Sequence, residues 1–191
     1  MPTLILKFDS PIQSWGTSLK LTNHDTGLYP SKSGVIGMIA SALGRRRDES
    51  IDDLSVLRFG VMIENQGTII DDFQVSEVSA SEKKTGHRKY LSDAVFICGI
   101  EGPENIINDI SFALRHPANA LFAGRRGCPV TAELLQKVVP ENLKDALQNN
   151  GSESMRIIVD AETPSGVAVR DLPLSFSPYD RQYTYRFIEE L

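Results

Sequence analysis

The sequence contains two short segments that combine glycine with serine, lysine or arginine, as anion-binding loops do. In Gly124-Arg125-Arg126-Gly127, two adjacent arginines stand between glycines, after an apolar run and before a proline. Paired guanidinium groups on a loop suit phosphate better than core packing, because each offers a planar fork of donors to phosphate oxygens. In Ser31-Lys32-Ser33, a serine-rich segment enters a helix of small and apolar residues, whose first backbone N–H groups favour an anion. Both segments therefore predict phosphate binding.

Histidine is the residue type that would carry acid–base cleavage of RNA, which needs a general base, a proton donor and a cation on the phosphate. The histidines are His24, His87 and His116, and we expect His116 to be structural because it precedes a proline at a predicted helix end. His87 stands near Lys84 and Arg88 and is the candidate catalytic centre. Its segment reads as a hairpin tip, a mobile place for precise chemistry. We therefore expect RNA binding without catalysis and keep a metal-independent endoribonuclease as the alternative.

Composition narrows the class of protein. The 191 residues include 20 Lys plus Arg and 25 Asp plus Glu, a formal net charge of −5 that argues against a freestanding DNA-coating protein. The basic residues nevertheless cluster, and local clusters can bind a short RNA. Cys98 and Cys128 lack metal-site spacing, as do the carboxylates, so we expect neither a metal nor a cofactor. No apolar run is long enough for a membrane span, so we expect a cytoplasmic location.

The hydrophobic pattern predicts an α+β fold. Alternation over 56–64 marks a half-buried strand, and apolar residues at helical spacing between Pro103 and Pro117 mark a helix. The predicted elements, in order, are strand 3–8, helix 33–44, strands 56–64, 68–78 and 89–100, helix 103–115 and strand 119–123. This βαβ(β)βαβ order is that of a ferredoxin-like, RNA-recognition-type core.

Two further regions are set apart from this core. The polar, lysine- and glycine-containing stretch over 79–89 lies between two predicted strands and reads as the tip of a protruding β-hairpin. Beyond it, the sequence predicts a helix near 140–148 and short strands at 155–161, 167–170 and 182–188. We therefore expect a ferredoxin-like RNA-binding domain over 1–130 and a small C-terminal helix/β subdomain over 131–191.

Three features have a structural reading beside the functional one. Trp15 can stack on an RNA base or fill the core, and a lone tryptophan after a strand is more often a core residue. Gly34-Val35-Ile36-Gly37 mimics the GxxG loop of KH domains, but we interpret it as close helix packing because its apolar residues continue a helical face. Arg45-Arg46-Arg47 can contact RNA or complement the dipole at its helix end.

Five ordered motifs between residue 4 and about residue 131 carry a family resemblance. They are Leu4-Ile5-Leu6-Lys7-Phe8, Pro11-Ile12-Gln13-Ser14-Trp15-Gly16, Thr26-Gly27 followed by Tyr29-Pro30-Ser31-Lys32-Ser33-Gly34, Lys89-Tyr90-Leu91-Ser92-Asp93-Ala94 and Gly124-Arg125-Arg126-Gly127-Cys128-Pro129. Together they resemble the CasD family, CRISPR-associated protein five of the type I-E Cascade complex. The resemblance implies a ferredoxin-like, non-catalytic subunit that holds the 5′ handle of a CRISPR RNA. It also implies packing against the backbone and large subunits of the complex in antiviral defence, with a different subunit cleaving the RNA.

The expected RNA-binding residues lie in the loops, the helix start and the hairpin. They are Gln13, Trp15, His24, Ser31, Lys32, Ser33, Arg45, Lys83, Lys84, His87, Arg88, Arg125 and Arg126. The alternative endoribonuclease would use His87 as its acid–base group. A third alternative, an interaction domain that binds no RNA, requires the basic clusters to be scattered over the surface.

Overall fold

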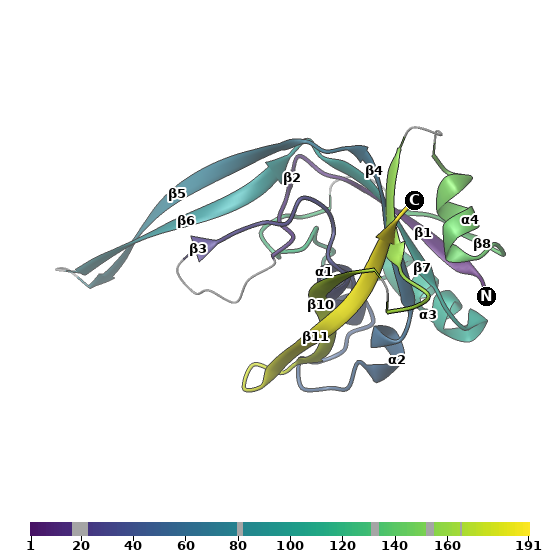
Figure 1. Ribbon diagram of the computed structural model, residues 1–191. Coiled ribbons are helices and arrows are strands. Elements are labelled where there is room, and N and C mark those ends of the chain that lie inside the picture. The colour runs from purple at the N-terminus through teal and green to yellow at the C-terminus, as the bar shows by residue number, and fades with distance from the viewer. Residues whose placement is uncertain (17–22, 80–81, 131–133, 152–154, 165) are drawn as a thin grey trace.

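The computed structural model describes residues 1–16, 23–79, 82–130, 134–151, 155–164 and 166–191. Antiparallel strands dominate these ranges, and helices pack against them (Figure 1). The strands are β1 (Thr3–Asp9), β2 (Ile12–Gln13), β3 (Asn23–His24), β4 (Arg58–Asn65), β5 (Thr68–Ser79), β6 (Glu82–Ser92), β7 (Val95–Glu101), β8 (Leu135–Val139), β9 (Arg156–Asp160), β10 (Val167–Phe176) and β11 (Arg181–Glu190). The helices are α1 (Lys32–Ala42), α2 (Asp52–Ser55), α3 (Glu104–Arg115) and α4 (Leu143–Gln148). Within the described ranges, no helix is long and apolar enough to cross a membrane.

A seven-stranded antiparallel sheet forms the body, in the order β10-β11-β9-β4-β7-β1-β8. Its central strands β1 and β7 are almost continuous apolar runs, because both faces of the sheet are covered. On one face, α1 and α3 close a core that includes Leu4, Ile39 and Phe59. On the other face, α4 packs over a second cluster that includes Ile5 and Met62. The sheet therefore fixes the position of α1, from which the functional surface is built.

Residues 131–191 add strands to both sides of this sheet. β8 pairs with β1, with Val138 opposite Leu4, and β9 pairs with β4, with Ile158 opposite Val61. β11 then pairs with β9, and β10 pairs with β11. Residues beyond 130 thus supply the strand partners that β1 and β4 need, so the sequence division between 130 and 131 is not a division between sheets.

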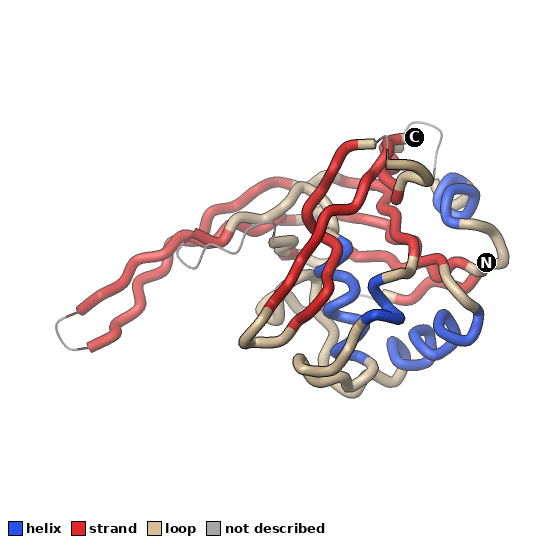
Figure 2. The backbone as a smooth tube through the Cα atoms, turned by 60° about the horizontal axis from the view of Figure 1, so that its bottom comes forward, coloured by secondary structure: helices blue, strands red, loops and turns tan. Residues whose placement is uncertain are grey.

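β5 and β6 form a long antiparallel hairpin that projects from the body (Figures 1 and 2). Its register runs from Thr68 opposite Ser92 at the base to Glu77 opposite Lys83 farther out. At the base, β2 pairs antiparallel and β3 pairs parallel with β6. The protruding hairpin predicted from the sequence is present. The prediction that 79–89 forms its tip is wrong, because 82–89 belong to β6, and a strand exposed to water can be as polar as a turn.

Two other predicted elements are corrected. The single predicted strand 89–100 is two strands, β6 and β7, separated by a turn in which Asp93 has a φ of 57°. The predicted strand 119–123 is an irregular segment that makes one isolated bridge, from Phe122 to Pro129. This bridge closes the loop that carries Arg125 and Arg126.

Candidate nucleic-acid interface

A cleft with a volume of ≈ 920 Å³ lies beside α1 and has a strongly basic lining. Its lining comes from one side of α1 between Ser33 and Ser41, the loop after that helix, the Gly124 loop and the β10–β11 hairpin. No acidic side chain is among the described residues that line it, whereas seven arginines are: Arg45, Arg46, Arg47, Arg125, Arg126, Arg170 and Arg181. Guanidinium groups bind phosphate in a bidentate fashion, so this lining suits a polyanion.

The loop that carries Arg125 and Arg126 is held by its backbone. Gly124 has a φ of 82°, and a Cβ built at this position would lie 2.1 Å from the carbonyl oxygen of Ser14. The N–H of Cys128 donates to the carbonyl of Arg125 at 2.8 Å, which closes the turn. Arg125 Nη2 donates to the carbonyl of Asp25 at 3.2 Å, and burial lowers the pKa of Arg125. The two arginines are therefore presented by a tight loop and not by a mobile one.

The arginines that follow α1 are partly paired with carboxylates. Arg45 donates to Asp53 from Nη1 at 2.6 Å and from Nη2 at 2.5 Å, and this hydrogen bonding raises the pKa of Arg45 and lowers that of Asp53. Arg46 donates to Asp48 at 3.2 Å. The Arg45–Asp53 pair holds this segment against α2, the Arg46–Asp48 pair lies within the loop, and Arg45, Arg46 and Arg47 still line the cleft. The segment therefore contributes to the basic lining, beyond any effect on the helix dipole.

Sequence reasoning missed the side of the cleft that the β10–β11 hairpin supplies. Arg170, Arg181 and Tyr183 come from two strands and are isolated in the sequence. Arg170 Nε donates to the carbonyl of Tyr183 at 3.5 Å, which ties the two strands beside the cleft. Phe122 and Phe176 also line it, so aromatic rings on which a base could stack lie among the arginines. Only the pairing of residues 167–176 with 181–190 brings this set together.

The anion site predicted at the start of α1 is occupied from within the chain. Ser31 caps the helix by accepting the N–H of Gly34 at 3.2 Å, and the N–H of Lys32 donates to Oδ2 of Asp171 at 2.8 Å. Lys32 itself is 4% exposed, and its Nζ lies 3.2 Å from Asp160; burial lowers its pKa. The prediction of phosphate binding by these helix-terminal groups is therefore corrected. Ser31 and Ser33 do line the cleft, and Ser33 is partly exposed.

Gln13 and Trp15 are fully buried, which corrects their predicted contact with RNA. Gln13 Nε2 donates to the carbonyl of Ala94 at 2.6 Å, and its Oε1 accepts from Trp15 Nε1 at 3.1 Å. The Trp15 ring meets Phe8 edge to face at 5.0 Å between centroids. Trp15 is thus a core residue that shapes the loops around the cleft. The GxxG segment packs closely as well, because a Cβ at Gly34 would meet the Trp15 ring at 3.0 Å.

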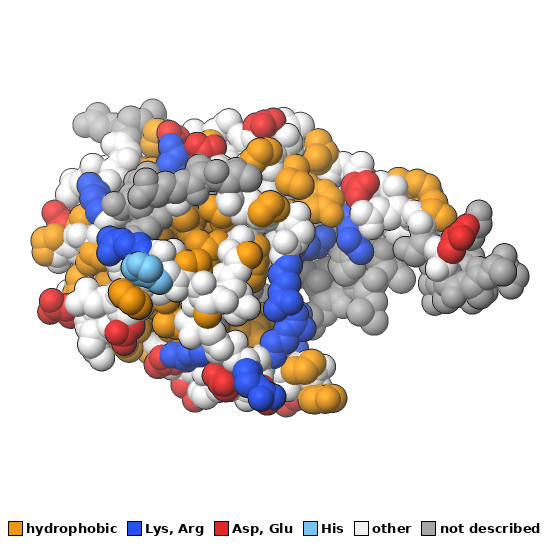
Figure 3. Space-filling view, turned by 180° about the vertical axis from the view of Figure 1, so that it is seen from behind, with side chains coloured by type: hydrophobic (Ala, Val, Ile, Leu, Met, Phe, Trp, Pro, Cys, Tyr) orange, Lys and Arg blue, Asp and Glu red, His pale blue; other side chains and the backbone are white. Residues whose placement is uncertain are grey.

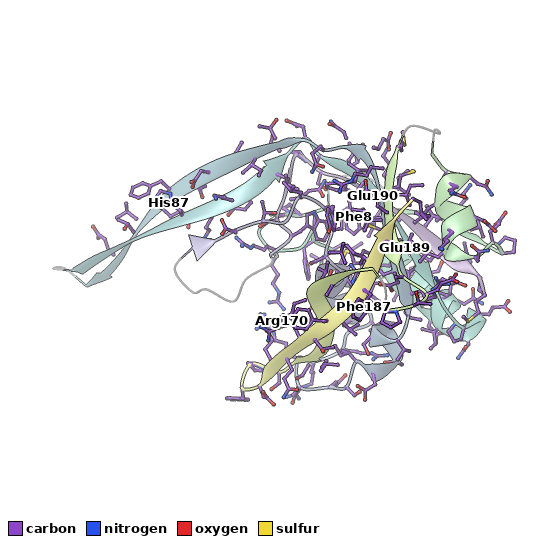
Figure 4. All side chains as sticks on the ribbon, in the orientation of Figure 1. Phe8, His87, Arg170, Phe187, Glu189 and Glu190 are labelled. Carbon is purple, nitrogen blue, oxygen red and sulfur yellow. The ribbon has the colours of Figure 1, made fainter. Side chains whose placement is uncertain are left out.

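The remaining predicted residues lie on the projecting hairpin, except His24, which lies on β3 beside it, and none of them is among the described residues that line the cleft. Arg88 is nevertheless near enough to Arg125 for the two charges to interact. Figure 4 shows His87 on the hairpin and Arg170 beside the β10–β11 pair. His87 is exposed, its Nδ1 lies 3.1 Å from Oδ1 of Asp71, and Arg88 is also exposed. The backbone of His24 pairs with Arg88 in register, whereas the side chains of His24, Lys83 and Lys84 lie outside the described residues. Seen from behind, Lys and Arg side chains form a column beside the base of the β5–β6 hairpin (Figure 3).

Comparisons with known proteins identify the family of this chain. Residues 3–189 match the model of a family described as CRISPR-associated protein (Cas5). The chain is 29% identical over 155 residues to the CRISPR system Cascade subunit CasD of Escherichia coli (strain K12), an alignment that covers 69% of this chain and 68% of that protein. A crystal structure of a Cas protein is 32% identical, with a TM-score of 0.81, over 99% of this chain and 93% of the other. A chain of a CRISPR RNA-guided surveillance complex is 27% identical, with a TM-score of 0.83, over 99% of this chain and 89% of the other.

These matches confirm the resemblance that the motifs of the first 131 residues carry. They also extend it through β8, β9 and the β10–β11 hairpin, because the family match ends at residue 189. The strands that carry Arg170 and Arg181 are therefore part of the family's fold and not an addition to it. The chain belongs to the CRISPR-associated Cas5 family.

Proposed function

We propose that this protein is a non-catalytic RNA-binding subunit of a type I-E Cascade surveillance complex, and that the arginine cleft holds the 5′ handle of the CRISPR RNA. The observation that carries the proposal is the cleft, with seven arginines and no acidic side chain among its described lining residues. The names of the matched proteins, a Cascade subunit and an RNA-guided surveillance complex, support the assignment to such an assembly.

A single-stranded RNA segment fits this lining better than a duplex does. Its phosphates can pair with the guanidinium groups, and its unstacked bases can lie against Phe122, Phe176 or Tyr183. In a duplex the bases are stacked on one another, and the aromatic side chains of the cleft would have no partner. The proposed ligand is therefore the unpaired end of the RNA.

We also propose that the core is ferredoxin-like. The elements β1-α1-β4-β7-α3-β8 run in the order βαββαβ, and their strands lie side by side as β4-β7-β1-β8. The β5–β6 hairpin is inserted between β4 and β7, and β9, β10 and β11 extend the β4 side of the sheet. We propose that the hairpin contacts the backbone subunit, that another face meets the large subunit, and that the complex is cytoplasmic.

A metal-independent endoribonuclease is the second candidate, and the contact between His87 and Asp71 favours it. Their Nδ1–Oδ1 distance of 3.1 Å is one that orients an imidazole for acid–base work. Both side chains are about half exposed, 53% and 49%, on the hairpin arm. Figure 4 shows His87 on the hairpin, well apart from Arg170 of the cleft, so the candidate base does not face that arginine and the geometry favours binding.

Assays of RNA binding and RNA cleavage by the purified protein separate the two functions. We expect the purified protein to bind a repeat-derived RNA that carries a single-stranded 5′ handle, to prefer it over a blunt duplex of equal length, and to leave it intact over hours without metal. His87→Ala should lower affinity only modestly. Site-specific cleavage that leaves a 2′,3′-cyclic phosphate, together with a loss of rate of about a hundredfold or more in His87→Ala, would instead establish the nuclease.

Shortening the hairpin should separate assembly from RNA binding. In the distal hairpin, residues 76–79 pair with residues 82–84, and Val75 lies opposite Thr85. Replacing everything between Val75 and Thr85 with a two-glycine turn therefore keeps the remaining register. We expect an unchanged thermal unfolding midpoint and unchanged RNA affinity of the isolated chain, with reduced incorporation into the complex on coexpression. Full incorporation of the shortened chain would show that the distal hairpin is not the contact.

A further inference from the structure

Four charged side chains meet beneath the β10–β11 side of the arginine cleft. Asp171 lies on β10, Arg186 on β11, Asp160 at the end of β9 and Lys32 at the start of α1. Asp171 and Arg186 are each 7% exposed and Lys32 is 4% exposed. The group therefore joins three strands of one sheet edge to the helix that forms the opposite side of the cleft.

Arg186 is the centre of this group because it bonds to both carboxylates. Its Nε and Nη2 donate to Oδ1 and Oδ2 of Asp171 at 2.6 and 3.0 Å, and its Nη1 donates to Oδ1 of Asp160 at 2.6 Å. Its guanidinium carbon lies 5.3 Å from the centroid of the Phe59 ring. The two carboxylates and the Phe59 ring fix the plane of the Arg186 guanidinium. A lysine ammonium has no such plane and could not bond to both carboxylates in this way.

The two carboxylates also bind backbone groups of the core. Oδ2 of Asp171 accepts the N–H of Lys32 at 2.8 Å, and Oδ2 of Asp160 accepts the N–H of Phe59 at 2.8 Å. Lys32 Nζ donates to the same oxygen of Asp160 at 3.2 Å. Two cations balance two anions, so the burial of charge is compensated as long as every member is present. Removing Arg186 would leave the buried Asp171 and the mostly buried Asp160 short of donors.

This network lies directly behind the arginines that line the cleft. Arg170 and Asp171 are neighbours on β10, where its register with β11 shifts between Val169 and Leu172. The contacts that hold the buried Asp171 therefore also fix the irregular segment from which the exposed Arg170 reaches the cleft. Arg170 in turn bonds to the backbone of Tyr183. β10 is the end strand of the sheet, with β11 as its strand neighbour, so its position depends on contacts of this kind. A further one is Phe176 packing against Gly37, where a Cβ would lie 3.5 Å from its ring.

We propose that Arg186 is a positioning residue for RNA binding: acting through Asp171 and Asp160, it holds the β10–β11 hairpin so that Arg170 and Arg181 face the cleft. The inference rests on the proposed function of the cleft. It predicts that Arg186, which is buried and touches no RNA, controls the phosphate contacts that Arg170 and Arg181 make.

The test compares single and combined variants by how strongly their affinity for the 5′-handle RNA depends on salt concentration. Arg170→Ala/Arg181→Ala should lower the slope of log K against log salt by up to about 1.4, that is about 0.7 for each lost phosphate contact on a single strand. Arg186→Met should cause the same loss although both cleft arginines remain. The triple variant should lose no more than either. Arg186→Lys, which keeps the charge without the fork, should recover only part of the loss.

Arg156→Met is the matched control, because Arg156 pairs with Glu190 at 2.6 Å on the exposed surface of the same sheet and should leave the slope unchanged. Circular dichroism establishes that each variant is folded. If Arg186→Met does not fold, Asp171→Asn serves in its place, since its amide oxygen still accepts the N–H of Lys32.

The outcomes separate this inference from the proposed function. A folded Arg186→Met with the wild-type slope, or losses that add in the triple variant, would overturn the positioning role while the cleft stands. An unchanged slope in Arg170→Ala/Arg181→Ala would overturn the cleft as the RNA site, and the positioning role with it.

Discussion

Replacing Arg125, Arg126, Arg170 and Arg181 together with alanine should remove most of the salt-dependent affinity for RNA. The four side chains line the same cleft and reach it from two different parts of the chain. If each pairs with one phosphate, the slope of log K against log salt falls by up to about 2.8, at about 0.7 per contact. Between 50 and 200 mM salt, the wild-type protein should then lose about fiftyfold more affinity than the variant. The measurement is fluorescence anisotropy across that range.

The matched control removes the same kind of charge elsewhere. Arg115 at the end of α3 and Lys137 on β8 are exposed and do not line the cleft. Arg115→Ala/Lys137→Ala should therefore leave the slope near that of the wild-type protein, although it changes the net charge. Equal loss of slope per charge in both variants would mean that RNA is bound by the overall charge and not by the cleft.

The core of the fold could be predicted because its pattern is local. β1, α1 and β4 are apolar segments, α3 carries apolar residues at helical spacing, and the predicted ranges agree with the observed ones within a few residues. The hairpin could be predicted only in outline. Its strands are exposed on both faces, so β6 carries neither an apolar run nor a clean alternation, and polarity alone suggested a turn.

The functional surface could be predicted only where it lies within one stretch of sequence. Arg125 and Arg126 are adjacent on a glycine loop, and the structure brings them to the cleft. Arg170 and Arg181 belong to the cleft through hairpin pairing, which no short motif records. The phosphate site predicted at the start of α1 was wrong for the same reason. A helix N-terminus that can bind phosphate can equally bind a carboxylate, and the carboxylate of Asp171 comes from a residue 139 positions away in the sequence.

Gly124→Ala should destabilise the protein far more than Gly127→Ala, although both glycines flank the same two arginines. At Gly124 the φ is 82°, and a Cβ would lie 2.1 Å from the carbonyl oxygen of Ser14 and 3.0 Å from the Trp15 ring. The left-handed conformation alone costs an L-residue roughly 1–2 kcal/mol, and the overlap forces the loop away from the Trp15 segment. The expected loss in free energy of unfolding is about 3 kcal/mol.

Gly127 is the internal control for that substitution. A Cβ there meets nothing within 4 Å, so Gly127→Ala should stay within about 0.5 kcal/mol of the wild-type protein. Urea unfolding gives both values, and equal m-values ensure that the midpoints report stability. Gly124→Ala should also lower the salt slope of RNA binding, since Arg125 and Arg126 move with the loop, whereas Gly127→Ala should preserve it. Coincident unfolding midpoints for the two variants would contradict the close approach of Gly124 to Ser14 on which the presentation of both arginines depends.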